Sequence, residues 1–141
     1  MAEKLGIAIQ YFSTPGPDAL RLAYAGLAAD PPQAIVVFPD PITFTNRRQI
    51  VDVANAHRIP VVSAWADFAE AGALYTYGPK LAESYRRVAY YVDRILKGTK
   101  PAELPIERPT VFEFVLNLKT ARALGIEIKP ALIERADRVI E

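Results

Sequence analysis

The feature that most constrains the fold is a series of short apolar runs, each followed by a segment with helical periodicity. The first three runs cover residues 7–12, 34–38 and 61–64, and β-branched residues recur in them. Continuous runs of this length are typical of strands buried on both faces of a parallel sheet. Amphipathic segments at about 17–29 and 46–57 separate them, so the alternation predicts an α/β fold with a mainly parallel sheet and right-handed crossovers.

The second half of the chain predicts a short strand at 73–77, a long helix at 79–96, a last strand at 111–118 and a short helix at 119–124. The long helix carries an apolar stripe that is wider than a solvent-facing helix should show. Its members are Leu81, Tyr85, Val88, Ala89, Val92, Ile95 and Leu96. We therefore expect another body to cover this helix.

Composition and charge argue against several classes of protein. Seventeen Lys and Arg against 16 Asp and Glu give a net charge of +1, spread along the chain, which makes nucleic acid a poor candidate partner. No apolar run approaches the roughly 18–20 residues that span a bilayer, so no membrane insertion is expected. The start of the chain lacks the pattern of a secretory signal, and as written the chain is expected to stay in the cytosol.

Metal, cofactor and catalytic motifs are missing from the sequence. It has no cysteine and one histidine, His57, at the polar end of a predicted helix, which leaves neither a metal site nor a Ser-His-Asp triad. No glycine-rich phosphate-binding loop occurs, so no nucleotide cofactor is expected. Asp40 follows a buried strand, as a phosphoryl-accepting nucleophile would, but the acidic partners of that chemistry are absent.

The candidate site lies at the carboxyl ends of the predicted strands, where open α/β sheets bind ligands. Three loops meet there: residues 13–16, 40–46 and 65–67. Asp40 has two interpretations that the residues alone leave open. It caps the following turn, or it accepts hydrogen bonds from a ligand amine or hydroxyl. The aromatic residues Phe44, Trp65, Tyr75 and Tyr77 lie in or beside these loops and suit either a pocket wall or core packing.

Several segments resemble one family. The strand-Pro-Asp loop VVFPDP, the helix ending ILKGTKPAELP, the segment NLKTARALGI and the terminal ADRVIE look like the C-terminal half of ABC-transporter substrate-binding proteins related to tryptophan-binding lipoproteins. The resemblance implies half of a type I periplasmic-binding-protein fold, in which two lobes close over a small solute and pass it to a membrane permease. It implies a Rossmann-like three-layer lobe with no catalytic residues.

The resemblance also implies site residues and a division of the chain. The ligand-facing loop maps onto Asp40 with Thr43, Phe44 and Asn46, the next cleft loop onto Trp65, and the hinge approach onto Tyr77 and Gly78. Residues 1–78 would form the binding lobe. Residues 79–104 would pack on the missing N-terminal lobe or on a dimer mate, and residues 105–141 would return to the lobe.

Three functions compete at this stage. The leading hypothesis is a lobe of an ABC importer that binds a small molecule such as an amino acid, with the permease as partner of a full-length protein and a homodimer through the 79–96 helix. The alternative is a cytosolic interaction or regulatory module that uses the helix face from Tyr85 to Ile95. The third is a small α/β enzyme that uses Asp40. The family is periplasmic or lipid-anchored, which leaves the compartment open.

Overall fold

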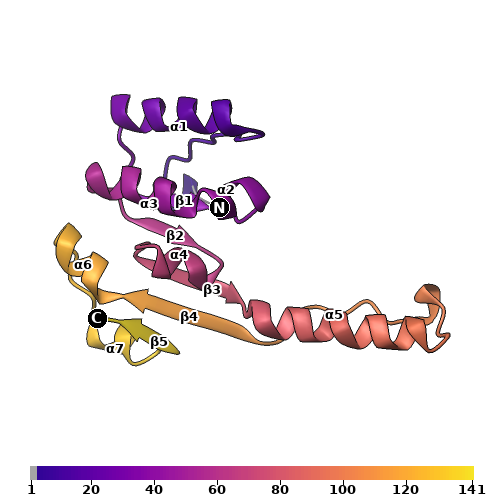
Figure 1. Cartoon of the computed structure of the whole chain (residues 1–141). Coiled ribbons are helices and arrows are strands. Elements are labelled where there is room, and N and C mark those ends of the chain that lie inside the picture. The colour runs from indigo at the N-terminus through magenta and orange to yellow at the C-terminus, as the bar shows by residue number, and fades with distance from the viewer. Residues whose placement is uncertain (1–2) are drawn as a thin grey trace.

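The chain folds around one five-stranded sheet. The computed structural model describes residues 3–141. The strands lie in the order β1-β2-β3-β4-β5 (Figure 1). Strands β1, β2 and β3 are mutually parallel, β4 is antiparallel to β3, and β5 is parallel to β4. Their bounds are β1 Ile35–Val37, β2 Val61–Ser63, β3 Tyr75–Pro79, β4 Phe112–Asn117 and β5 Arg138–Ile140. The predicted α/β fold with a mainly parallel sheet is confirmed.

Helices connect these strands. They are α1 Pro17–Ala29, α2 Pro41–Thr45, α3 Arg47–Ala56, α4 Ala66–Glu70, α5 Leu81–Leu96, α6 Leu118–Leu124 and α7 Pro130–Ile133, with short 3₁₀ turns at Glu3–Leu5 and Pro101–Glu103. Among the residues that the structure describes, no helix combines the length and apolar character needed to cross a bilayer. The 46–57 helix predicted from the sequence is observed as α3, but the separate helix α2 was predicted only as a loop.

The main core lies on one face of β1 and β2, which we call the core face. Val37 and Val61 point from these strands into a cluster that holds Val51 of α3 and Phe68 of α4. Leu20 of α1 joins the same cluster. The helices α1, α3 and α4 therefore contribute to one layer of apolar side chains on the core face, and this layer fixes where the loops after β1 and β2 stand.

The predicted strand at residues 7–12 is wrong. This segment has no strand assignment and pairs with no strand among residues 3–141. Ile9 and Tyr11 are 55% and 83% exposed. The run has the apolar composition of a buried strand, but a strand also needs a neighbour to bond its backbone. The described residues supply no such neighbour.

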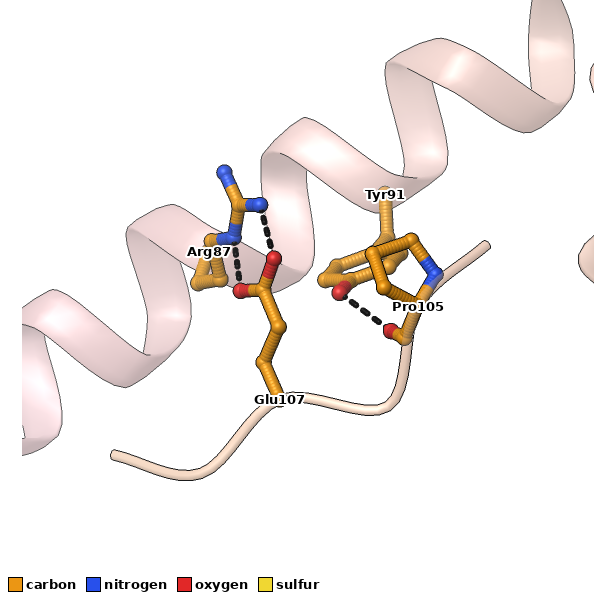
Figure 2. Close-up of polar contacts among 4 residues, drawn as sticks. All are labelled: Arg87, Tyr91, Pro105 and Glu107. Atoms are coloured by element: carbon orange, nitrogen blue, oxygen red, sulfur yellow. Dashed lines mark hydrogen bonds and ion pairs between the residues drawn. The ribbon is translucent and has the colours of Figure 1, made fainter. Parts of the chain in front are cut away.

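Helix α5 and the connector that returns from it form an arm, residues 81–111, that extends away from the sheet (Figure 1). No residue from 81 to 111 is buried. Polar contacts hold the connector to the helix: Arg87 donates two hydrogen bonds to Glu107, and the Tyr91 hydroxyl donates to the Pro105 carbonyl (Figure 2). The hydrogen bonds from Arg87 hold the pKa of Glu107 below its ordinary value. The arm thus lacks an apolar core of its own.

Candidate functional site

Asp40 caps helix α2 and closes the loop that follows β1. Its Oδ1 atom accepts hydrogen bonds from the amides of Ile42 and Thr43, at 2.7 and 2.9 Å. The Thr43 hydroxyl accepts from the Asp40 amide at 2.9 Å and donates to the Phe38 carbonyl at 3.0 Å. Pro41 at the first helical position suits this start, because its missing N–H has no partner there anyway. Asp40 therefore serves as a cap, the first of the two interpretations that the sequence left open.

The cap leaves one Asp40 oxygen available. Both amides bond to Oδ1, and Oδ2 has no hydrogen-bond partner within residues 3–141. The residue is half-buried, whereas Thr43 is buried at 7% exposure. The roles of these two neighbours thus differ: Thr43 fixes the loop from inside, and Asp40 presents a carboxylate oxygen at the loop surface.

An aromatic corner stands next to this loop. Phe44 of α2 and Trp65, which precedes α4, meet edge to face with ring centroids 5.3 Å apart. The Arg47 guanidinium lies over the Phe44 ring at 4.5 Å and also donates to the Phe44 carbonyl at 2.8 Å. Phe44 follows β1 and Trp65 follows β2, so the parallel pairing of these strands brings the two rings together. All three residues are half-buried and can offer an apolar wall with a cationic rim.

Asn46 joins α2 to α3. Its side-chain amide donates to the Ile42 carbonyl at 2.8 Å, which satisfies the end of α2. Asn46 is also the residue that precedes α3, but its side chain makes no capping bond there. Asn46 therefore stabilises the bend between the short helices α2 and α3.

Tyr77 and Gly78, both on β3, are placed differently. Gly78 packs against the end of β2, where a Cβ atom on this residue would stand 2.4 Å from the Ala64 carbonyl oxygen. Tyr77 points to the opposite face of the sheet, where it stacks on Phe112 with centroids 5.7 Å apart. Among the described residues, the Tyr77 ring contacts those of Phe112 and Phe114 and makes no aromatic contact with Phe44 or Trp65. The structure thus brings Gly78 to the site edge and leaves Tyr77 away from the aromatic corner.

A small pocket lies where the arm leaves the sheet. Its volume is about 180 Å³, and its charged lining residues include Asp67, Glu70, Lys80, Glu113 and Arg138. Arg138 bonds Glu70 at 2.9 Å and lies 4.0 Å from Glu113. The sequence did not predict this group, because its members lie on segments that only the β3-β4-β5 pairing brings together.

The described residues give no indication of a metal at this site. No group of three or more His, Asp or Glu side chains placed to hold a metal ion occurs within residues 3–141. Burial raises the pKa of Tyr24, which packs against the core cluster rather than in the loops. The arrangement offers one carboxylate oxygen, one aromatic corner and one nearby cation at adjacent strand ends. Such a set can bind a small molecule by shape and charge.

The sequence and the fold are similar to those of known proteins. Residues 1–140 match the family described as ABC transporter substrate binding protein. A conserved domain protein from Vibrio cholerae is 25% identical and superposes with a TM-score of 0.89 over 98% of this chain and 46% of its own. The ABC domain from Streptococcus pneumonia in complex with L-Trp is 24% identical, with a TM-score of 0.89 over 99% of this chain and 47% of its own.

A third solved structure is more distant. The ligand-free, open form of a substrate binding protein with adhesive properties from Clostridium difficile is 19% identical, with a TM-score of 0.65 over 99% of this chain and 46% of its own. No curated protein matches the sequence. The chain spans about half the length of each solved relative. From the family match over nearly every residue, this chain belongs to the family of ABC transporter substrate binding proteins.

Proposed function

We propose that this chain is a solute-binding lobe that holds a small molecule, such as an amino acid, and performs no catalysis. The observation that carries the proposal is the Phe44–Trp65 corner beside Asp40 at the carboxyl ends of β1 and β2. Small-molecule sites combine apolar walls with a few polar anchors. The family match supports a binding role, and the ligand of the pneumococcal relative, L-Trp, supports an amino acid as the class of solute.

Each side chain has a distinct part in this proposal. The aromatic corner would contact the flat or apolar part of the solute. The free Oδ2 atom of Asp40 would accept from its amine, since hydrogen bonds to a charged acceptor contribute about 1.5–3 kcal/mol. Thr43 and Asn46 would keep the loop in place through their bonds to backbone carbonyls. Gly78 would admit the close approach of β3 to β2, and Tyr77 would act at the approach to the arm.

In this proposal the described residues supply one wall of the binding pocket. The arm starts directly after β3, at the sheet edge where the site loops lie, and extends in the same direction (Figure 1). We propose that tight binding requires an opposing lobe, that residues 1–78 and 105–141 belong to one binding lobe, and that delivery to an ABC permease is a property of the completed protein.

Fluorescence gives a direct test, because Trp65 is the only tryptophan in the chain. Titration with each standard amino acid is expected to change the Trp65 emission for a subset of them, with the largest effect for aromatic or branched ones. Asp40→Asn should lower the affinity measured in this titration about tenfold, since a neutral acceptor replaces a charged one. Leu22→Ala, on the exposed surface of α1, is the matched control.

The proposal fails if every amino acid leaves both the emission and the calorimetric heat unchanged at millimolar concentration. It also fails if a solute binds with an affinity that neither Asp40→Asn nor Phe44→Ala alters. In the second case the chain binds solutes, but at another place.

The exposed apolar side chains of α5 favour a second function, in which the arm binds another protein chain. Leu81, Tyr85, Val88, Val92 and Ile95 follow one another at spacings of four and three residues, which is the pattern of a helix-pairing seam. Tyr85 and Val88 are 71% and 57% exposed. We propose that two copies of the isolated chain pair through α5, because fully burying each large apolar side chain is worth about 1.5–3 kcal/mol.

Analytical ultracentrifugation tests this pairing. The chain is expected to sediment as a dimer at micromolar concentration, and Val88→Asp as a monomer with an unchanged circular dichroism spectrum. Leu22→Asp places the same charge on an exposed apolar position of α1 and should leave the dimer intact. A monomeric wild-type chain under these conditions would rule out the pairing.

A further inference from the structure

Arg47 differs from the other basic side chains in its burial. It is half-buried, whereas the other 16 of the 17 Lys and Arg residues are exposed. A charged side chain is seldom withdrawn from water unless a group of opposite charge compensates it. The position of Arg47 beside the candidate site therefore calls for an explanation.

No carboxylate within residues 3–141 pairs with Arg47. The ion pairs in this part of the chain involve five other cations: Arg21, Arg86, Arg87, Lys97 and Arg138. The Arg47 Nη1 atom donates to the Phe44 carbonyl at 2.8 Å, which uses one of the five N–H donors of a guanidinium. The edge formed by Nε and Nη2 makes no hydrogen bond within residues 3–141. Such an edge can bind a carboxylate through two parallel hydrogen bonds.

Two contacts hold the guanidinium at the aromatic corner. It lies 4.5 Å from the centroid of the Phe44 ring, which meets Trp65 edge to face. Its bond to the Phe44 carbonyl fixes it a second time. A side chain that is already held in this way loses less freedom when it binds a ligand. The free edge of Arg47 is therefore preorganised next to the two rings.

Arg47 and Asp40 contact opposite ends of α2. Asp40 caps the first turn and has a free oxygen, Oδ2, whereas Arg47 bonds the Phe44 carbonyl in the last turn. The loop thus offers a negative acceptor and a positive donor, with one aromatic ring between them in the chain. A phosphate dianion would meet the negative charge of Asp40 in this loop, so a singly charged carboxylate suits the pair better.

We propose that Arg47 determines the specificity of this site by binding the carboxylate of the solute. The inference rests on the proposed function, because it assigns a further residue to the same site, and it names the class of solute: a carboxylic acid with an apolar or aromatic body, amino acids included. The Nε–Nη2 edge donates two hydrogen bonds to the carboxylate, and the apolar body contacts the corner. The site requires the carboxylate, and an amine on the solute adds affinity through Asp40.

Calorimetric titration of the chain with three probes of similar shape tests this role. The probes are L-phenylalanine, 3-phenylpropionate and 2-phenylethylamine, each raised to millimolar concentration. Arg47→Gln should lower the affinity for the two carboxylates at least about tenfold, because it removes both charge-assisted bonds, and that for the amine less than about twofold. Arg48→Gln removes the same charge from the next residue, which is exposed, and is the matched control that should change none of the three affinities.

A comparison of ligands on the wild-type chain gives a readout that needs no variant. 3-Phenylpropionate should bind at least about tenfold more tightly than its neutral amide, 3-phenylpropanamide. Inorganic phosphate at the same concentration should not displace it. Arg47→Lys keeps the charge but not the two-pronged geometry, so it should retain only part of the preference for the carboxylate.

An equal loss of affinity for all three probes in Arg47→Gln would overturn the proposal, because the residue would then only support the loop. Unchanged affinity of this variant for both carboxylates would also overturn it, as would equal affinity of the wild-type chain for 3-phenylpropionate and its amide. If neither carboxylate binds the wild-type chain at all, the proposal is likewise wrong.

This inference and the proposed function can fail separately. Amino acid binding that does not respond to Arg47→Gln would leave the proposed function standing and would reject the role of Arg47. Binding of 3-phenylpropionate that depends on Arg47, without binding of any amino acid, would support the role of Arg47 and would count against an amino acid as the solute.

Discussion

Substitutions at Asp40 can separate the stability of the loop from the affinity for a solute. Replacement of Asp40 by Ala removes the acceptor for the Ile42 and Thr43 amides. Loss of an N-cap costs about 0.5–2 kcal/mol and typically about 1. The Thr43 hydroxyl keeps its bond to the Phe38 carbonyl in this variant, so the loop stays partly tied. We expect a loss near the middle of that range, about 1 kcal/mol of unfolding free energy.

Urea denaturation followed by circular dichroism measures this loss. For a chain of this size, about 1 kcal/mol corresponds to a fall in Tm of roughly 3–4 °C. Asp40→Asn keeps a good capping acceptor and should lose no more than a few tenths of a kcal/mol. If the Ala variant is as stable as the wild type, or if Asn costs as much as Ala, the capping bonds do not stabilise the loop as described.

The same pair of variants separates the cap from the ligand. Asp40→Asn leaves the loop built but removes the negative charge. If the carboxylate binds a solute amine, this variant should lose about tenfold in affinity with little loss of stability. A variant that keeps its affinity would show that Asp40 is structural only, and the solute anchor would then have to be sought elsewhere.

Two further predictions follow from contacts of Gly78 and Glu107. Gly78→Ala should destabilise the chain by about 1–3 kcal/mol in urea denaturation, because the new Cβ would stand 2.4 Å from the Ala64 carbonyl oxygen and force β2 and β3 apart. Gly16→Ala, where a Cβ atom would have no neighbour within 4 Å, should cost much less. The lowered pKa of Glu107 means that its pairing with Arg87 stabilises the arm above the ordinary pKa of a glutamate, and that this contribution is lost as the pH falls through the lower folded value. The protection factors of the connector amides should therefore fall at acid pH. Glu107→Gln should lower them already at neutral pH and abolish this pH dependence.

Elements that form by burying apolar side chains could be predicted from the sequence. Elements that depend on pairing with a distant strand could not. The runs at 34–38 and 61–64 became β1 and β2, because these segments pair with each other and bury Val37 and Val61 in the core. The run at 7–12 has the same composition but no pairing partner, and no local pattern reports that lack. Helix α2 was missed although its start, Asp40 followed by Pro41, is a favourable cap and first position.

The candidate site could also be predicted only in part. The proximity of Phe44 and Trp65 was predictable, because the ends of neighbouring parallel strands must meet at one sheet edge. Tyr77 was grouped with them by its position along the chain, but strand alternation turns it to the other face. The pocket that holds Glu113 and Arg138 could not be predicted, since it depends on β4 and β5 returning beside β3.

The exposed surfaces and the half-built site have one physical explanation. The arm has no buried residue, β1 pairs with β2 alone among the described strands, and Val36 and Tyr77 are exposed on the face opposite the core face. The arm leaves the sheet after β3, at the edge that carries Asp40 and the aromatic corner, so a body that packs on the arm would stand beside the corner. Exclusion of water from the corner would strengthen each polar contact to a solute. Solute affinity and assembly should therefore be coupled: a ligand that bridges the corner and the covering body must tighten their association by the factor by which the body tightens ligand binding.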